Sequence, residues 1–308
     1  MMIIENWFRA TDGKTIFYNE FVPENGKVKF VVQIVHGMAE HSERYTEFAD
    51  FLVKKGAAVY ASDHRGHGRN AMEPGEYGVW PQKKIWCTII DDLKMVNDIC
   101  AKNHPGVPIF VIGHSMGSFL TRSFISQYNF GVKGVILTGS GYNPTLLLQV
   151  GLLIAKLQCF FRGVGKSSKL LDKMSFGSFN KGYDSPFQWL TRDQKIVDQY
   201  IEDPKCGGVF SCSFWRGFFS GLIAINKVRN VKKISRDLPI LFLSGDNDPV
   251  GDSGKGVIKA VGFYKNLGLK KVEYKLYKDA RHEILNEINR EEVYQDIANW
   301  IDKIITND

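Results

Sequence analysis

The chain alternates short apolar segments with longer amphipathic ones, and this alternation constrains its fold more than any other feature. Five segments have the apolar character of β-strands: residues 15–22, 30–35, 57–62, 108–112 and 134–138. Three segments between them have apolar residues at helical spacing: residues 43–55, 86–103 and 116–128. This rhythm predicts a parallel sheet with helices on both faces. Residues 5–10 and 15–22 flank Asp12-Gly13, which predicts a hairpin at the start of the sheet.

The alternation stops after Ser140 and resumes near Pro239. Residues 142–236 contain no convincing strand, but they include three segments of helical character: residues 145–161, 191–202 and 213–228. A strand, a helix, a strand and a helix then follow at 239–244, 254–267, 271–277 and 290–305. We therefore expect an α/β fold with one core domain formed by residues 1–140 and 237–308. Residues 141–236 are expected to form an inserted helical cap.

Composition and charge exclude several classes of protein. The chain has 308 residues, of which 44% are hydrophobic and 24% charged, so it is neither a fibrous nor a disordered protein. The formal net charge of +7 is spread along the sequence, which favours a solvated basic surface over nucleic-acid binding. The five cysteines include no Cys-x-x-Cys pair, so neither a disulfide framework nor a thiolate zinc site is indicated. With no signal-like or membrane-spanning segment, we expect a cytoplasmic protein.

A candidate nucleophile follows the predicted strand at 108–112. Gly113-His114-Ser115-Met116-Gly117 has the pattern G-x-S-x-G, and a predicted helix follows it. In this strand–turn–helix context the pattern is typical of a serine nucleophile held on a sharp turn. The flanking glycines allow close backbone packing there.

A serine nucleophile needs a base, and the base needs an acid that orients it. Asp246, Asp248 and Asp252 follow the predicted strand at 239–244, and His282 follows the next strand. His282 is the only histidine after position 114, so it is the candidate base. Asp248 is the favoured acid because Pro249 biases it toward an extended conformation. Asp246 is expected to stabilise the loop, as aspartates often do in turns.

An acyl-transfer site also needs two N–H donors for the oxyanion. The residue after the nucleophile, Met116, is expected to supply one of them. The loop after strand 30–35 is expected to supply the other from Met38, with Gly37 permitting the turn. His36 in the same loop is expected to brace it by hydrogen bonding.

Five stretches resemble the α/β-hydrolases of the monoacylglycerol lipase and lysophospholipase group, also called the serine aminopeptidase-like family. They are HGMAEHSERY (36–45), DHRGHGR (63–69), GHSMG (113–117), GDNDPV (245–250) and RHEILNE (281–287). The resemblance implies an α/β-hydrolase fold, with a mostly parallel eight-stranded sheet. It also implies a triad of Ser115, Asp248 and His282, with Met38 and Met116 as the oxyanion hole. The resemblance is weakest in residues 141–236, where members of this group carry a variable cap that sets substrate choice.

Two other patterns carry less weight. Asp63, His64 and His67 lie within five positions, but no further zinc ligand is evident, so a loop braced against the site is expected. Residues 251–256 resemble a phosphate loop only faintly, because Val257 stands where a lysine is needed. We therefore expect no metal and no cofactor.

The predicted cap is unusually apolar. Residues 145–161 contain ten large apolar side chains, a composition too apolar for a solvated helix and too interrupted for a membrane span. Such a segment suits an acyl-chain tunnel or transient contact with a lipid surface, aided by Arg162, Lys166 and Lys169, although it could simply pack on the core. Aromatic residues gather again at 210–219, as expected of a pocket roof.

We therefore expect a serine hydrolase that cleaves a carboxylic ester with an apolar acyl group, of the monoacylglycerol or lysophospholipid type. An aminopeptidase-like amide hydrolase and a catalytically silent binding protein are the alternatives. The expected partner is a small-molecule or lipid ester, and the sequence carries no signal for an oligomeric state.

Overall fold

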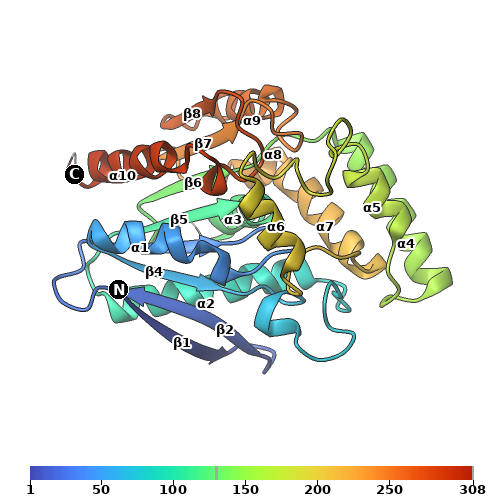
Figure 1. The fold of residues 1–308 in the computed structure, drawn as a ribbon, viewed down its shortest axis with the longest axis horizontal. Coiled ribbons are helices and arrows are strands. Elements are labelled where there is room, and N and C mark those ends of the chain that lie inside the picture. Colours follow the sequence, from blue (N-terminus) through green and yellow to red (C-terminus); the bar gives the residue numbers. More distant parts are fainter. Residues whose placement is uncertain (129–130, 307–308) are drawn as a thin grey trace.

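In the computed structural model, which describes residues 1–128 and 131–306, eight strands form one sheet (Figure 1). Their order across the sheet is β1-β2-β4-β3-β5-β6-β7-β8. The strands are β1 (Met2–Arg9), β2 (Thr15–Val22), β3 (Phe30–Val35), β4 (Ala57–Ser62), β5 (Ile109–His114), β6 (Gly134–Thr138), β7 (Ile240–Gly245) and β8 (Val272–Tyr277). All pairs from β4 to β8 are parallel, and β2 is antiparallel to both of its neighbours. The predicted sheet and its hairpin are confirmed.

The helices of the described residues agree with the predicted ones except near residue 170 and at residues 226–231, where the predicted segment 213–228 ends early as α7 and a short helix, α8, follows. They are α1 (Thr46–Lys54), α2 (Ile85–Asn103), α3 (Met116–Gln127), α4 (Thr145–Arg162), α5 (Lys169–Phe176), α6 (Gln194–Glu202), α7 (Cys212–Ile225), α8 (Val228–Val231), α9 (Lys255–Asn266) and α10 (Arg290–Thr306). Helix α5 was not predicted because it is short and follows a glycine- and serine-containing stretch. It begins where the Ser168 hydroxyl accepts the Leu171 N–H, a local capping bond.

The two faces of the sheet are covered by different helices. Along β6, Val135 and Leu137 pack in the cluster that includes α2, α3, α7 and α9. Ile136 points to the other face, toward the cluster that includes α1 and α10. This alternation follows from the two-residue repeat of a strand, and it explains why the central strands are apolar at every position.

The parallel direction of the strands brings the motif loops together. β3, β5, β7 and β8 all point the same way, so the segments after Val35, His114, Gly245 and Tyr277 emerge at one edge. These segments carry the predicted oxyanion loop, the nucleophile, the acid and the base. Ligands of open parallel sheets bind at this edge.

Along the chain, helices α4–α8 follow β6 and precede β7, and α4 and α5 lie at the right of Figure 1. α4 packs on α7, where Gly151 approaches the ring of Phe219 so closely that a Cβ would lie 2.9 Å from it. Among the described residues, α4 is the one helix long and apolar enough to cross a bilayer by length and composition alone.

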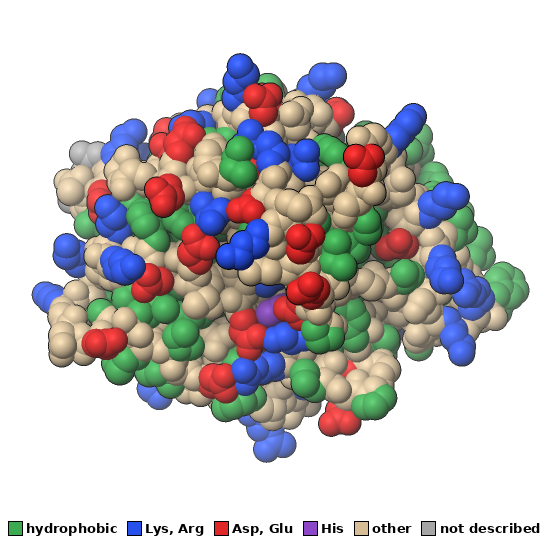
Figure 2. Space-filling view, viewed as in Figure 1, with side chains coloured by type: hydrophobic (Ala, Val, Ile, Leu, Met, Phe, Trp, Pro, Cys, Tyr) green, Lys and Arg blue, Asp and Glu red, His purple; other side chains and the backbone are tan. Residues whose placement is uncertain are grey.

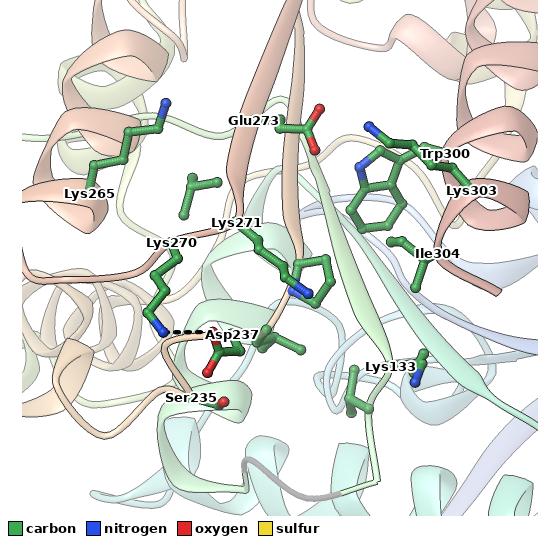
Figure 3. A pocket seen from close by; sticks show the side chains of 14 residues that line it. Lys133, Ser235, Asp237, Lys265, Lys270, Lys271, Glu273, Trp300, Lys303 and Ile304 are labelled. Carbon is green, nitrogen blue, oxygen red and sulfur yellow. Dashed lines mark hydrogen bonds and ion pairs between the residues drawn. The ribbon is translucent and has the colours of Figure 1, made fainter. Parts of the chain in front are cut away.

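A groove of about 780 Å³ opens at the opposite edge of the sheet, where β6, β7 and β8 begin (Figure 3). Five lysines line it together with Asp237, Glu273 and Trp300: Lys133, Lys265, Lys270, Lys271 and Lys303. Lys270 pairs with Asp237 at 3.1 Å. None of the predicted catalytic residues lines this groove, so it is not the candidate active site.

Candidate active site

Ser115 lies on a strained turn between β5 and α3. Its φ of 49° and ψ of −119° place a non-glycine residue in a conformation that L-residues rarely adopt. A Cβ on Gly117 would lie 1.9 Å from the Val35 carbonyl oxygen, and one on Gly113 would lie 2.4 Å from the Thr121 hydroxyl. The two glycines of the motif are therefore required sterically, because they let β5 and α3 meet at this sharp angle.

The structure brings Asp248 and His282 together. Their Oδ1 and Nδ1 atoms are 2.9 Å apart, and both side chains are buried. Burial alone would raise the pKa of Asp248, but the His282 ring and the Val250 N–H hold that pKa below its usual value. Burial also disfavours charged His282, but the Asp248 carboxylate raises the pKa of His282 above its usual value. Nδ1–H donates to Asp248, which leaves Nε2 to exchange protons.

The other two aspartates of the same loop do not contact His282. Asp252 is exposed, and Asp246 Oδ1 is buried without a hydrogen-bond partner among the described residues. Asp248 reaches His282 because hydrogen bonds of its backbone N–H and of its carboxylate fold the turn inward. The carboxylate accepts the Val250 N–H at 2.9 Å. Of these three aspartates, Asp248 is the one with a hydrogen bond to His282.

Ser115 and His282 line one cavity of about 230 Å³, without a hydrogen bond between them among the described residues. Catalytic hydrogen bonds are often long before substrate binds. A second histidine, His114, has its ring centroid 4.8 Å from that of His282. Burial lowers the pKa of His114 to about 3, so this neighbouring ring stays neutral.

One of the two predicted oxyanion donors directly follows Ser115, and the other lies on the cavity wall. Met116 is the first residue of α3, so its backbone N–H has no acceptor within the helix. Met38 lines the cavity on the loop after β3. The carbonyl of the next residue, Ala39, accepts hydrogen bonds from the Tyr200 hydroxyl at 2.9 Å and the Gly207 N–H at 3.0 Å. Residues 200 and 207, in the 141–236 segment, therefore hold the loop that carries Met38.

His36 braces the loop after β3 by hydrogen bonds. Its Nε2 accepts the His64 N–H at 2.9 Å, and its Nδ1 therefore donates to the Gly37 carbonyl at 2.8 Å. The Asp63 carboxylate accepts the N–H groups of Ser42 and Arg69 at 2.8 and 2.7 Å. His36 and Asp63 thus hold the loops after β3 and β4 together.

A buried arginine links the oxyanion loop to the histidine loop, and sequence reasoning missed it. Arg44 contacts both carboxylate oxygens of Glu283 at 2.7 Å and Glu40 Oε2 at 2.7 Å. Glu40 Oε1 accepts the Gly37 N–H at 2.5 Å. Burial and the neighbouring Glu283 raise the pKa of Glu40. Burial also opposes ionisation of Glu283, but Arg44 outweighs it and lowers the pKa of that carboxyl. The sequence did carry one signal for this contact, because Arg44, Glu40 and Glu283 all lie inside the motifs at 36–45 and 281–287.

Apolar side chains from the 141–236 segment line the rest of the cavity, together with one acid, Asp172. They are Phe176, Phe187, Trp189, Leu190, Val209 and Phe210. The Trp189 ring packs against His282 in a tilted arrangement, with 5.0 Å between ring centroids, and the Trp189 carbonyl oxygen accepts the His282 N–H at 3.4 Å. Neither Phe176 nor Trp189 was predicted, because their approach to the site depends on tertiary packing.

One group of side chains outside this cavity could offer metal ligands. Ligand atoms of His41, Asp203 and Cys206 lie within 4.8 Å of one another. His41 Nε2 already contacts Asp203 Oδ2 at 2.8 Å, and its Nδ1 lies 3.5 Å from Glu43. The Nδ1 atom of His41 forms no hydrogen bond among the described residues.

Comparison with known proteins settles the family. A model of the family described as serine aminopeptidase, S33, matches residues 26–289. The chain belongs to this family. It is 27% identical over 300 residues to the monoacylglycerol lipase of Mycolicibacterium smegmatis, and the matched region covers 96% of each chain. It is 28% identical over 298 residues to the monoglyceride lipase of Rattus norvegicus, covering 94% of this chain and 88% of the other.

The fold has close relatives of known structure. The chain superimposes on a thermostable carboxyl esterase from Bacillus coagulans with a TM-score of 0.91 and 28% identity, covering 99% of both chains. It superimposes on a soluble variant of monoglyceride lipase from Saccharomyces cerevisiae with a TM-score of 0.76 and 21% identity, covering 99% of this chain and 95% of that chain. The fold is therefore that of an α/β-hydrolase, as the sequence motifs predicted.

Proposed function

We propose that this protein is a serine hydrolase that cleaves carboxylic esters through an acyl-enzyme. Ser115 Oγ attacks the ester carbonyl while His282 Nε2 accepts its proton. Asp248 keeps the imidazole in the tautomer that this step requires. The N–H groups of Met38 and Met116 stabilise the oxyanion, and His282 returns the proton to the leaving alcohol. Water then attacks the acyl-enzyme by the same route.

One observation carries this proposal: His282, hydrogen-bonded to the buried Asp248, lines the same cavity as a serine held at φ 49°. Backbone strain at a single residue persists only where the surrounding structure holds that residue in place, and such strained residues cluster at active sites. A binding protein needs neither the strained serine nor the paired acid and base.

The substrate we propose has an apolar acyl group. Six apolar side chains of the 141–236 segment line the cavity, and this segment is proposed to act as a cap. Relatives named monoacylglycerol lipase support an ester of the monoacylglycerol type, and a lysophospholipid is the other ester within the proposal.

We further propose that the cap makes transient contact with a lipid surface in the cytoplasm. One side of α4 presents large apolar side chains to solvent, with Phe160 82% and Phe161 76% exposed. Exposed lysines and arginines flank this face. Figure 2 shows apolar and basic side chains together at the right edge of the molecule. An apolar face bordered by cations suits an anionic membrane interface.

The test uses a fluorophosphonate probe and p-nitrophenyl esters of increasing chain length, with Ser115→Ala as the control. Labelling of the wild type alone, with faster turnover of medium-chain than acetyl esters, is the expected result. An unlabelled wild-type protein would support a silent binding protein instead. Turnover of an aminoacyl amide without any ester turnover would support an aminopeptidase.

A further inference from the structure

One carboxylate in the catalytic cavity has no partner. Asp172, on α5, lines the same cavity as Ser115 and His282. The other two carboxylates there, Glu40 and Glu283, are bound by Arg44. Among the described residues, no hydrogen bond or ion pair reaches the Asp172 side chain. Burial raises its pKa above the usual value, and no neighbouring cation opposes that effect. An unpaired, half-buried carboxylate costs stability, so its position calls for an explanation.

The position of Asp172 is built into the structure of the cap. It lies one helical turn before Phe176, so both side chains face the cavity. Phe176 stacks on Trp189 with 6.0 Å between ring centroids, and Trp189 packs against His282. The start of α5 is held by Ser168, whose N–H donates to the Phe210 carbonyl at 2.9 Å. Asp172 and the aromatic pair beside the base therefore line one cavity, on a helix that is held at its start.

An alternative role in helix stability does not account for this placement. An acidic residue in the first turn of a helix interacts favourably with the helix dipole. That benefit is the same on any face of the helix, including those open to water. α5 instead places Asp172 in a cavity lined mainly by apolar side chains.

We infer that Asp172 is a specificity-determining residue that accepts a hydrogen bond from a hydroxyl group, or pairs with a cationic group, on the alcohol part of the ester. The inference rests on the proposed ester hydrolysis. An ionised carboxylate only accepts hydrogen bonds, so a polyol or a cation suits it. A phosphate near the ester is repelled by the same charge. Asp172 thus separates neutral glyceryl esters from phosphate-bearing ones.

The test compares four decanoyl esters that differ only in the alcohol: methyl, glyceryl, choline and glycerol 3-phosphate. Specificity is the kcat/KM of each ester divided by that of the methyl ester. We expect the wild type to prefer the glyceryl or the choline ester and to discriminate against the glycerophosphate. In Asp172→Asn the kcat/KM ratio of the preferred ester to the methyl ester should fall about tenfold, and the ratio for the glycerophosphate ester should rise. Turnover of the methyl ester should stay within about twofold of the wild-type value.

The matched control is Asp184→Asn, the same substitution at an exposed residue between α5 and α6 that does not line the cavity. It should keep the wild-type ratios. A preference for the glyceryl ester identifies the polyol as the group bound, and one for the choline ester identifies the cation. Unchanged ratios in Asp172→Asn would overturn the inference. If the wild type hydrolyses none of the four esters, the proposed function itself fails, and the inference fails with it.

Discussion

Arg44 and Glu283 form a buried, two-point ion pair between segments 239 residues apart in the chain. Both nitrogen–oxygen distances are 2.7 Å, and the same guanidinium contacts Glu40 beside the oxyanion loop. Glu283 directly follows His282. One arginine therefore connects the two loops that hold the proposed base and the proposed oxyanion donor Met38. Its planar shape suits this bidentate contact, which lysine cannot reproduce.

Replacing Arg44 by Met should destabilise the fold by about 3–5 kcal/mol, because two buried carboxylates lose their common partner. Chemical unfolding would measure this loss, and an ester assay should show a lower kcat in the protein that remains folded. Lys270→Met is the control, since it removes an exposed pair with Asp237 and should cost less than about 1 kcal/mol. Equal stability of the two variants would contradict the linking role of Arg44.

Asp248→Asn should lower kcat by roughly 10³- to 10⁴-fold while leaving KM nearly unchanged. The amide cannot stabilise the imidazolium that forms during catalysis, and it favours the wrong tautomer of His282. Steady-state kinetics on a p-nitrophenyl ester would measure the effect. Asp252→Asn makes the same change at an exposed residue of the same loop and should retain full activity. Similar losses in both variants would argue against Asp248 as the orienting acid.

As the pH is lowered, activity should begin to decline at a pH above the ordinary histidine pKa of about 6.5. His282 acts as a base only when neutral, and Asp248 and Glu283 raise its pKa despite the opposing effect of burial. As pH falls through this raised pKa, the imidazole becomes protonated and kcat/KM falls. Asp248 keeps its charge over this range because its own pKa is lowered.

A pH profile of kcat/KM would locate this limb. Glu283→Gln removes one of the negative charges that raise the His282 pKa, so the limb should move to lower pH in the folded variant. A wild-type limb well below pH 6, or a shift to higher pH in Glu283→Gln, would be incompatible with this electrostatic account.

Phe160→Ser combined with Phe161→Ser should weaken binding to anionic vesicles by at least about tenfold. Both rings are largely exposed, so their loss should leave folding and turnover of a soluble short-chain ester intact. Vesicle sedimentation would measure the binding. Ile3→Ser, at an exposed apolar residue on β1, serves as the control. Wild-type binding by the double variant would show that α4 does not contact lipid.

Much of the fold could be predicted because its signals are local. The alternation of apolar and amphipathic segments predicted the strands and helices that face the core. The strand–turn–helix context of Ser115 indicated the candidate nucleophile. The same reasoning missed α5, whose eight residues carry too little periodic signal, and with it the cavity position of Asp172.

The amino-acid sequence by itself determined the sheet, its interruption by helices and the residue types available for catalysis. Only the tertiary structure decided which of three aspartates contacts His282, that Arg44 joins Glu40 to Glu283, and that Trp189 packs on the base. The reason is physical: periodicity records how each segment meets the core, whereas a site is formed by side chains brought together from distant segments. Their distances depend on how strands, loops and helices α4–α8 pack against one another.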